Sequence, residues 1–115
     1  MSNEAWPRDL TFDRAAKALR VSFDDGAAFT IPFELLRVYS PSAEVRGHRE
    51  SERIVVMGKE NVGVTRAEPV GNYAVRIVFD DGHDSGLYSW ALLYELGRDR
   101  EKKTNEYFMA QLKKG

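Results

Sequence analysis

Ala74-Val-Arg-Ile-Val-Phe-Asp-Asp-Gly82 repeats the pattern of Ala18-Leu-Arg-Val-Ser-Phe-Asp-Asp-Gly26. In both stretches branched or aromatic side chains alternate with other residues, and this period of two is typical of a β-strand. Each strand pattern then ends in Asp-Asp-Gly. Glycine adopts a positive φ without steric cost and aspartate bonds its own backbone, so the tripeptide predicts a tight hairpin turn. The chain therefore contains the same strand-and-turn unit twice.

A second short strand and a helix follow the turn in each copy. The strands are predicted at residues 28–31 and 85–88, and the helices at residues 32–37 and 89–96. Proline suits the first turn of a helix and serine is a favourable N-cap, which is how the two helices begin. Gly97 is predicted to end the second helix, because glycine is common just past a helix C-terminus.

Phe33 and Trp90 occupy the same place in the two copies when the second hairpin has one extra residue. We expect both, together with Tyr88 and Leu92, to pack in the core rather than to form a ligand pocket. Two copies are too few for a solenoid. The expected fold class is α+β, with one small, mostly antiparallel sheet made of two hairpin–helix units and both helices packed on it.

The region between the two copies is less regular. Residues 39–53 are polar and predict a loop, and residues 54–57 form a short apolar strand candidate. Another strand is predicted at residues 62–70, where Pro69 marks the end of the strand or an edge of the sheet. Gly71 and Asn72 predict a turn into the second copy.

Residues 98–114 predict a long C-terminal helix. Phe108 and Leu112 lie four residues apart, about one helical turn, with Tyr107 and Met109 beside them. Residues 98–115 hold six Lys or Arg against three acidic residues, a local charge of +3, whereas the rest of the chain carries −4. This basic excess is either the solvated face of a helix or a docking surface for an acidic partner.

The length of 115 residues fits a single domain, residues 1–115, with a core of about residues 10–97 before the C-terminal helix. The absence of cysteine removes disulfides, thiolate metal sites and thiol nucleophiles. The net charge of −1 argues against binding of nucleic acid, which would require a basic excess. No apolar run approaches the roughly 20 residues of a membrane span, and the first residues lack the apolar core of a signal peptide. We therefore expect a cytoplasmic protein with no membrane partner.

Catalytic motifs are missing from the sequence. It contains no Gly-x-Ser-x-Gly elbow, no Gly-x-x-x-x-Gly-Lys loop and no Gly-x-Gly-x-x-Gly fingerprint. His83 and Ser85 would share one face of a hairpin, but such proximity is common and does not make a catalytic triad. We expect a protein that is not an enzyme; a deep pocket holding His83 with Ser40 or Tyr39 would reopen the question.

The acidic turn around His83 is the best candidate for metal chemistry. His83 with Asp81 or Asp84, and with His48 as a further candidate, offers nitrogen and oxygen ligands to a divalent ion such as iron. The spacing matches neither an EF-hand nor a two-His-one-carboxylate triad. The first copy has the same Asp-Asp-Gly followed by Ala27, so turn chemistry alone explains the acids, whereas the turn does not require His83.

The polar loop after the first helix is the other candidate site. It is too polar to be core, and it brings together Tyr39, Ser40, Ser42, Arg46 and His48. The segment is interpreted either as a solvated loop or as a binding surface for a protein partner or an anion.

Two motifs resemble the family of gamma-butyrobetaine hydroxylase-like N-terminal domains, with the resemblance covering roughly residues 10–97. They are Leu36-Arg-Val-Tyr-Ser-Pro-Ser-Ala-Glu-Val-Arg-Gly-His48 and Val70-Gly-Asn-Tyr-Ala-Val-Arg-Ile-Val-Phe-Asp-Asp-Gly-His-Asp-Ser-Gly-Leu-Tyr-Ser-Trp90. Such domains also occur as stand-alone bacterial proteins of unknown function. In the hydroxylases the domain precedes a 2-oxoglutarate-dependent oxygenase domain, for which this chain has neither the length nor a His-x-Asp motif.

The resemblance also implies a structural zinc site in the hydroxylases, formed by three cysteines and a histidine. The cysteine positions fall on Ser40, Ser42 and Val45 of this chain, and the histidine falls on His83. Structural zinc takes four deprotonated nitrogen or sulfur donors, and a serine hydroxyl is a poor substitute for a thiolate. The resemblance therefore implies the fold, whereas the residues argue against the zinc.

The same family includes domains fused to P-loop scaffold ATPases of iron–sulfur cluster assembly. By this analogy the unidentified partner would be an iron–sulfur assembly factor or an oxygenase. The leading hypothesis is therefore a non-catalytic accessory or protein-interaction domain with no certain cofactor. The alternative is a metal-binding protein that uses His83 and the neighbouring carboxylates to hold iron or another divalent ion.

Overall fold

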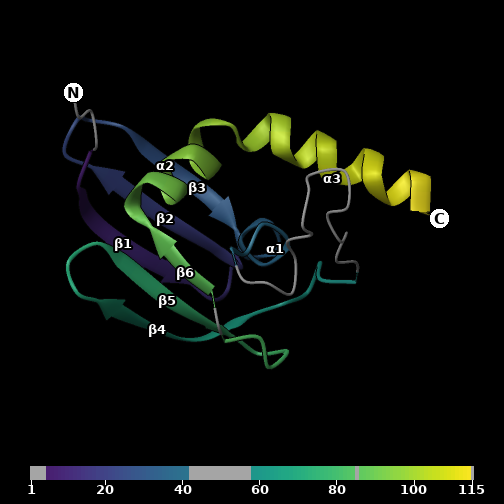
Figure 1. Cartoon of the computed structure of the whole chain (residues 1–115), viewed down its shortest axis with the longest axis horizontal. Coiled ribbons are helices and arrows are strands. Elements are labelled where there is room, and N and C mark those ends of the chain that lie inside the picture. The colour runs from purple at the N-terminus through teal and green to yellow at the C-terminus, as the bar shows by residue number, and fades with distance from the viewer. Residues whose placement is uncertain (1–4, 42–57, 85, 115) are drawn as a thin grey trace.

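The structure, a computed structural model, describes residues 5–41, 58–84 and 86–114. These residues form six strands and three helices (Figure 1). In both hairpin–helix units the order is strand, strand, helix. In chain order the elements are β1 (Pro7–Asp13), β2 (Ala18–Phe23), β3 (Ala28–Pro32), α1 (Phe33–Val38), β4 (Val64–Val70), β5 (Ala74–Phe79), β6 (Gly86–Ser89), α2 (Trp90–Arg98) and α3 (Arg100–Lys114).

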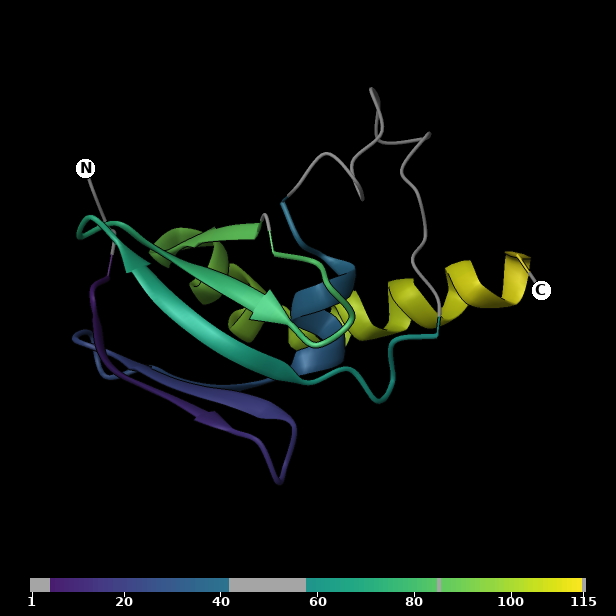
Figure 2. The same ribbon diagram turned by 90° about the horizontal axis from the view of Figure 1, so that it is seen from below.

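The described strands form two antiparallel sheets, ordered β1-β2-β3 and β4-β5-β6. They lie as separate layers (Figure 2). The α+β class and the two antiparallel hairpin–helix units are thus confirmed, but the expected single shared sheet is wrong. Each hairpin pairs instead with the strand that precedes it, β1 or β4, so the two hairpins do not pair with each other. β1 was not predicted, although Leu10 and Phe12 alternate along it and both pack against the core.

The two Asp-Asp-Gly turns have the same geometry, as the repeat predicts. The Phe23 N–H donates to the Ala27 carbonyl at 2.8 Å, and the Phe79 N–H donates to the His83 carbonyl at 2.9 Å. The third residue of each tripeptide is a glycine in the left-handed region, with φ of 94° in the first turn and 93° in the second. The sequence repeat is therefore also a structural repeat.

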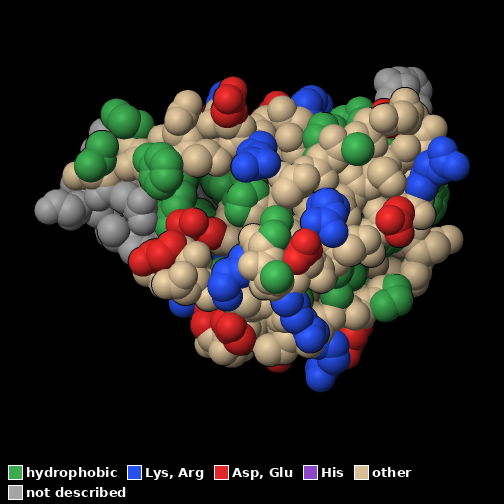
Figure 3. Space-filling view, turned by 180° about the vertical axis from the view of Figure 1, so that it is seen from behind, with side chains coloured by type: hydrophobic (Ala, Val, Ile, Leu, Met, Phe, Trp, Pro, Cys, Tyr) green, Lys and Arg blue, Asp and Glu red, His purple; other side chains and the backbone are tan. Residues whose placement is uncertain are grey.

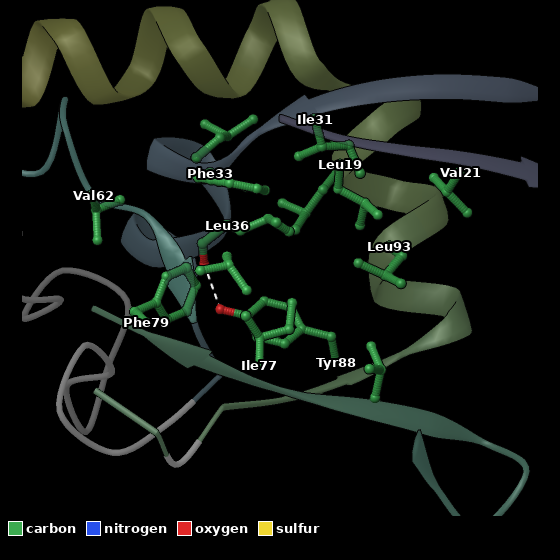
Figure 4. Close-up of a cluster of buried hydrophobic side chains, with 14 of the residues drawn as sticks. Leu19, Val21, Ile31, Phe33, Leu36, Val62, Ile77, Phe79, Tyr88 and Leu93 are labelled. Atoms are coloured by element: carbon green, nitrogen blue, oxygen red, sulfur yellow. Dashed lines mark hydrogen bonds between the residues drawn. The ribbon is translucent and has the colours of Figure 1, made fainter. Parts of the chain in front are cut away.

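The core lies between the two sheets and the helices, and both units contribute to it (Figure 4). Phe33 and Tyr88 are fully buried, as expected, whereas Trp90 and Leu92 are only partly buried and pack against the margin of the core. The Tyr88 hydroxyl donates to the Leu36 carbonyl, which joins β6 to α1 through the core. Burial raises the pKa of the Tyr88 hydroxyl, so it stays protonated as a donor.

Gly97 does not end the second helix, which is a correction to the sequence prediction. Ser89 caps α2 as expected, accepting from the Leu92 N–H at 3.1 Å, but the helix runs on to Arg98 and α3 begins at Arg100. A Cβ at position 97 would lie 2.3 Å from Cγ of Phe29. The glycine is needed because the β3 side chain packs directly on the helix backbone.

The other predicted elements agree where the structure describes them. β4 falls inside the predicted strand, Pro69 lies near its end at a sheet edge, and residues 71–73 form a turn. The strand candidate at residues 54–57 and most of the loop at residues 39–53 lie outside the described residues. Of the helices described, none has the length and apolar character that crossing a bilayer requires.

Replacing Gly97 with alanine should destabilise the domain by about 1–3 kcal/mol, because the added methyl group overlaps Phe29. Without this overlap the substitution would stabilise a helix by up to about 1 kcal/mol. Urea unfolding measures the difference. In a Phe29→Ala background the penalty should disappear, and a G97A variant as stable as the parent chain would contradict the packing assigned to Gly97.

Candidate functional site

The second aspartate of each turn binds the backbone of its own turn. One carboxylate oxygen of Asp25 accepts from the Ala27 N–H at 2.9 Å, and one of Asp81 accepts from the His83 N–H at 3.1 Å. This bond to the residue two positions on is the usual reason for aspartate in a turn. Each carboxylate thus has a second oxygen left for another element.

That second oxygen accepts a hydrogen bond from the helix of the other unit. Asp25, in the first unit, accepts from the Tyr94 hydroxyl of α2 at 2.7 Å. Asp81, in the second unit, accepts from Nε of Arg37 in α1 at 2.9 Å. Arg37 and Tyr94 hold equivalent positions, four residues after Phe33 and Trp90. The two units therefore exchange helix-to-turn contacts.

Asp81 lies in the more strongly charged of the two exchanged contacts. Besides Arg37, it accepts from Nζ of Lys59 at 2.6 Å, and only 19% of its side-chain surface is exposed. Partial burial acts to raise the pKa of Asp81, but the hydrogen bonds from Lys59, the His83 N–H and Arg37 outweigh it and hold that pKa well below its usual value. The Arg37 guanidinium is almost fully buried. Asp81 therefore compensates a buried positive charge.

His83 and Ser40 meet beside this ion pair. Nε2 of His83 lies 2.8 Å from the Ser40 hydroxyl, and both side chains are buried. The contact joins the second turn to the end of α1. In the first copy the residue equivalent to His83 is Ala27, which has no polar side chain. Gly86 permits the approach, because a Cβ there would lie 2.8 Å from Oγ of Ser40 and 2.9 Å from the Tyr88 ring. His83 therefore lies beside the segment that follows the first helix.

The predicted binding surface is only partly visible in the described residues. Tyr39 is half-buried, donates its hydroxyl to the Lys103 carbonyl at 3.1 Å, and lies under the Lys103 ammonium. Ser40 is fully buried and therefore cannot contribute to an exposed surface in this structure. The other members of the set, Ser42, Arg46 and His48, lie outside the described residues.

The residues proposed to bind metal are spread around the turn. Asp81 is occupied by Arg37 and Lys59, and Asp84 is exposed. Residues 5–41, 58–84 and 86–114 contain no group of three His, Cys, Asp or Glu that could hold an ion. The metal-binding alternative therefore gains no support from these ranges.

The family's structural zinc does not fit the residues present. Two of the four corresponding positions, Ser40 and His83, do lie in contact, which places them as the resemblance implies. The contact is a hydroxyl–imidazole hydrogen bond, however, and a serine hydroxyl is not a donor that structural zinc prefers. Ser42 and Val45, the other two positions, lie outside the described residues.

The Ser40–His83 pair meets the distance expected of a nucleophile and its base. A substrate must also reach the hydroxyl, and Ser40 has no exposed surface while His83 is only 7% exposed. The arrangement is that of a buried polar contact that satisfies both groups. It therefore supports a structural role for the pair.

A group of exposed apolar side chains lies elsewhere in the described structure, on α3. The helix spans the predicted residues, but Phe108 is 52% exposed, Met109 57% and Leu112 74%. Of the apolar residues in this stretch, Tyr107 is the one that is buried. The last turns of α3 extend beyond the sheets (Figures 1 and 2), and hydrophobic side chains gather at this end of the molecule (Figure 3). The spacing of Phe108 and Leu112 predicts the helix but not that this face is exposed.

Replacing Asp81 with asparagine should lower the free energy of unfolding by about 2–3 kcal/mol near neutral pH, because it removes a negative charge that lies against the buried Arg37. The folded-state pKa lies below the ordinary value of 3.8. The contribution is therefore fully present above that value and is lost as the pH falls through the folded-state pKa. Urea unfolding should show the two proteins converging in stability below about pH 4. Asp84→Asn, an exposed control in the same turn, should have little effect at any pH, and an equal loss from both variants would contradict the role of Asp81.

Comparisons with known proteins agree with the fold. The model of the family described as gamma-butyrobetaine hydroxylase-like, N-terminal, matches residues 10–94. One NMR solution structure is 47% identical with a TM-score of 0.82, covering 98% of this chain and 83% of that chain. A second NMR solution structure is 39% identical with a TM-score of 0.79, covering 94% and 85%.

A third solved structure, from Acidithiobacillus ferrooxidans, is a crystal structure of a DUF971-family protein with unknown function. It is 34% identical with a TM-score of 0.66, covering 78% of this chain and 90% of that chain. No curated protein matches the chain. The match over most of the sequence, together with these structures, shows that the chain belongs to the gamma-butyrobetaine hydroxylase-like, N-terminal family.

Proposed function

We propose that this chain is a non-catalytic accessory domain that binds another protein through the outer face of α3. The observation that carries the proposal is the exposure of Phe108, Met109 and Leu112, which are neighbours on the last two turns of that helix. Single exposed apolar residues are common, whereas a contiguous group points to an interaction site. The name α3 surface is used below for these three residues.

The composition of the α3 surface suits protein binding. Aromatic side chains and methionine are enriched at protein interfaces, and the flexible thioether of Met109 adapts to an irregular partner surface. Burying a side chain such as Phe108 or Leu112 contributes roughly 1.5–3 kcal/mol. Three adjacent anchors of this kind are sufficient for the centre of a small interface.

The first half of α3 is fixed to the domain, which holds the α3 surface in place. Nη1 of Arg100 donates to the Thr30 carbonyl at 2.9 Å, and the Tyr39 hydroxyl donates to the Lys103 carbonyl at 3.1 Å. Lys103 also pairs with Glu95 of α2 at 3.3 Å. Because α3 is already formed and anchored, this chain loses little conformational entropy on binding.

The family gives the proposal a biological setting by analogy. Its association with oxygenases and with iron–sulfur scaffold ATPases suggests a partner among iron–sulfur assembly factors or oxygenases, and a cytoplasmic location. The alternative, binding of iron or another divalent ion by His83 with Asp81 or Asp84, is weaker. Asp81 compensates Arg37 and Lys59, so it would have to leave both to bind a cation.

Removing two anchors should abolish partner binding without unfolding the domain. We expect the tagged full-length chain to retain one stoichiometric protein from its own cytosol, and the Phe108→Ser/Leu112→Ser variant to lose it. Because both side chains are exposed, the variant should keep its unfolding midpoint. Quantitative mass spectrometry of the retained proteins measures the loss.

The matched control is Tyr73→Ser/Leu87→Ser, which removes two exposed apolar side chains from the β4–β5 turn and β6. This control should retain the partner at the level of the parent chain. Equal loss from both variants would assign binding to general surface hydrophobicity, and recovery of no stoichiometric protein would contradict the proposed function.

A further inference from the structure

We propose that the hydrogen bond between Ser40 and His83 replaces, in this chain, the zinc that the resemblance implies for the hydroxylases, so that the domain folds without a metal ion. Ser40 follows α1, and His83 lies in the turn between β5 and β6. These are the two segments that the zinc would hold together, and the contact between Oγ of Ser40 and Nε2 of His83 joins them directly. The chain keeps the connection and changes its chemistry.

The distance between the two atoms fits a hydrogen bond and not a shared metal ion. Nε2 of His83 lies 2.8 Å from Oγ of Ser40, which is within the range of a hydrogen bond. Two nitrogen or oxygen ligands of a tetrahedral zinc, each about 2.0–2.2 Å from the metal, lie about 3.3–3.6 Å apart. The imidazole and the hydroxyl are therefore placed as partners of each other.

The chain packs closely around the Ser40 hydroxyl. Ser40 has no exposed surface, and His83 is 7% exposed. A Cβ at position 86 would lie 2.8 Å from Oγ of Ser40 and 2.9 Å from the Tyr88 ring, so the β6 backbone lies against the hydroxyl. Burial raises the pKa of the Tyr88 hydroxyl, and a hydrogen bond with Ser40 opposes part of that rise. Because a hydroxyl donates one hydrogen bond and accepts two, Ser40 can serve His83 and Tyr88 together.

The charges beside the contact also disfavour a metal ion. Asp81, whose carboxylate accepts from the His83 N–H, lies 2.9 Å from Nε of Arg37 and 2.6 Å from Nζ of Lys59. The Arg37 guanidinium is almost fully buried. A divalent cation at His83 would add two positive charges near these basic side chains, and like charges repel more strongly where water is excluded. The carboxylate of this turn already compensates Arg37 and Lys59.

Thermal unfolding of the full-length chain with and without metal tests whether zinc contributes to the fold. The unfolding midpoint should be the same after dialysis against EDTA and in about 100 µM Zn²⁺, because a ligand raises the midpoint only when it binds the folded state. A site with a dissociation constant of about 1 µM would raise the midpoint by about 10 °C under these conditions. A rise of this size, or a fall in EDTA that Zn²⁺ reverses, would overturn the proposal.

Variants at position 83 test the hydrogen bond itself. The amide of glutamine reaches about as far as Nε2 of histidine, so His83→Gln can keep a hydrogen bond to Ser40, whereas glutamine is not a usual zinc ligand. His83→Gln should therefore unfold at a midpoint about 4–8 °C above that of His83→Ala. In a Ser40→Ala background most of this advantage should disappear, because the partner hydroxyl is gone.

The matched control is Ser22→Ala, which removes a half-buried hydroxyl from β2 and should change the midpoint by no more than about 2 °C. Equal midpoints of His83→Gln and His83→Ala, or an advantage of glutamine that persists unchanged without Ser40, would contradict the hydrogen bond. If neither His83 variant folds, Ser40→Ala decides the question. A midpoint about 4–8 °C below that of the parent chain would support the proposal, and an unchanged midpoint would contradict it.

Discussion

The exchange of helix-to-turn contacts between the two units is the constraint on which the structure depends. Asp25 and Asp81 each use one oxygen to close their own turn and the other to hold the helix of the opposite unit. Neither hairpin–helix unit can therefore complete its polar contacts alone. The buried core, to which both units contribute, and the Tyr88 bond to the Leu36 carbonyl fix the same arrangement from within.

The two exchanged contacts have diverged in strength and in their neighbours. Asp25 accepts from a neutral hydroxyl at the surface, whereas Asp81 is surrounded by Arg37 and Lys59 and lies next to the buried Ser40–His83 contact. The second joint lies at the end of α1, where Arg37 and Ser40 stand on either side of Tyr39, the residue that contacts α3. Of the polar residues that first suggested a functional site, Ser40, Asp81 and His83 therefore belong to this joint, which lies beside the helix that we propose binds the partner.

The repeat could be predicted because its causes are local. Alternation gives the strands, Asp-Asp-Gly gives the turns, and Ser89 gives the helix start, all within a few residues of sequence. Gly97 shows where local reasoning fails: its role is set by Phe29, far away in the chain, and not by the end of a helix. The division into two sheets likewise depends on which strand joins each hairpin, and sequence periodicity does not encode that choice.

The candidate site, like the fold, was predicted only in part. His83 was identified because it is the residue that the turn does not require, and its contact with Ser40 follows from the family motif. The burial of Ser40 and the pairing of Asp81 with Arg37 depend on tertiary contacts. The exposure of Phe108 and Leu112 could not be predicted either, because an apolar spacing of four residues indicates a helical face without saying what covers it.

We propose different roles for two parts of the molecule: the Ser40–His83 region is a structural joint, and the α3 surface binds the partner. Cross-saturation NMR on the complex with the recovered partner tests this division most directly. We predict signal loss at Phe108, Met109 and Leu112, with His83 and Ser40 unaffected. Signal loss centred on His83 and Ser40, with α3 unchanged, would contradict it.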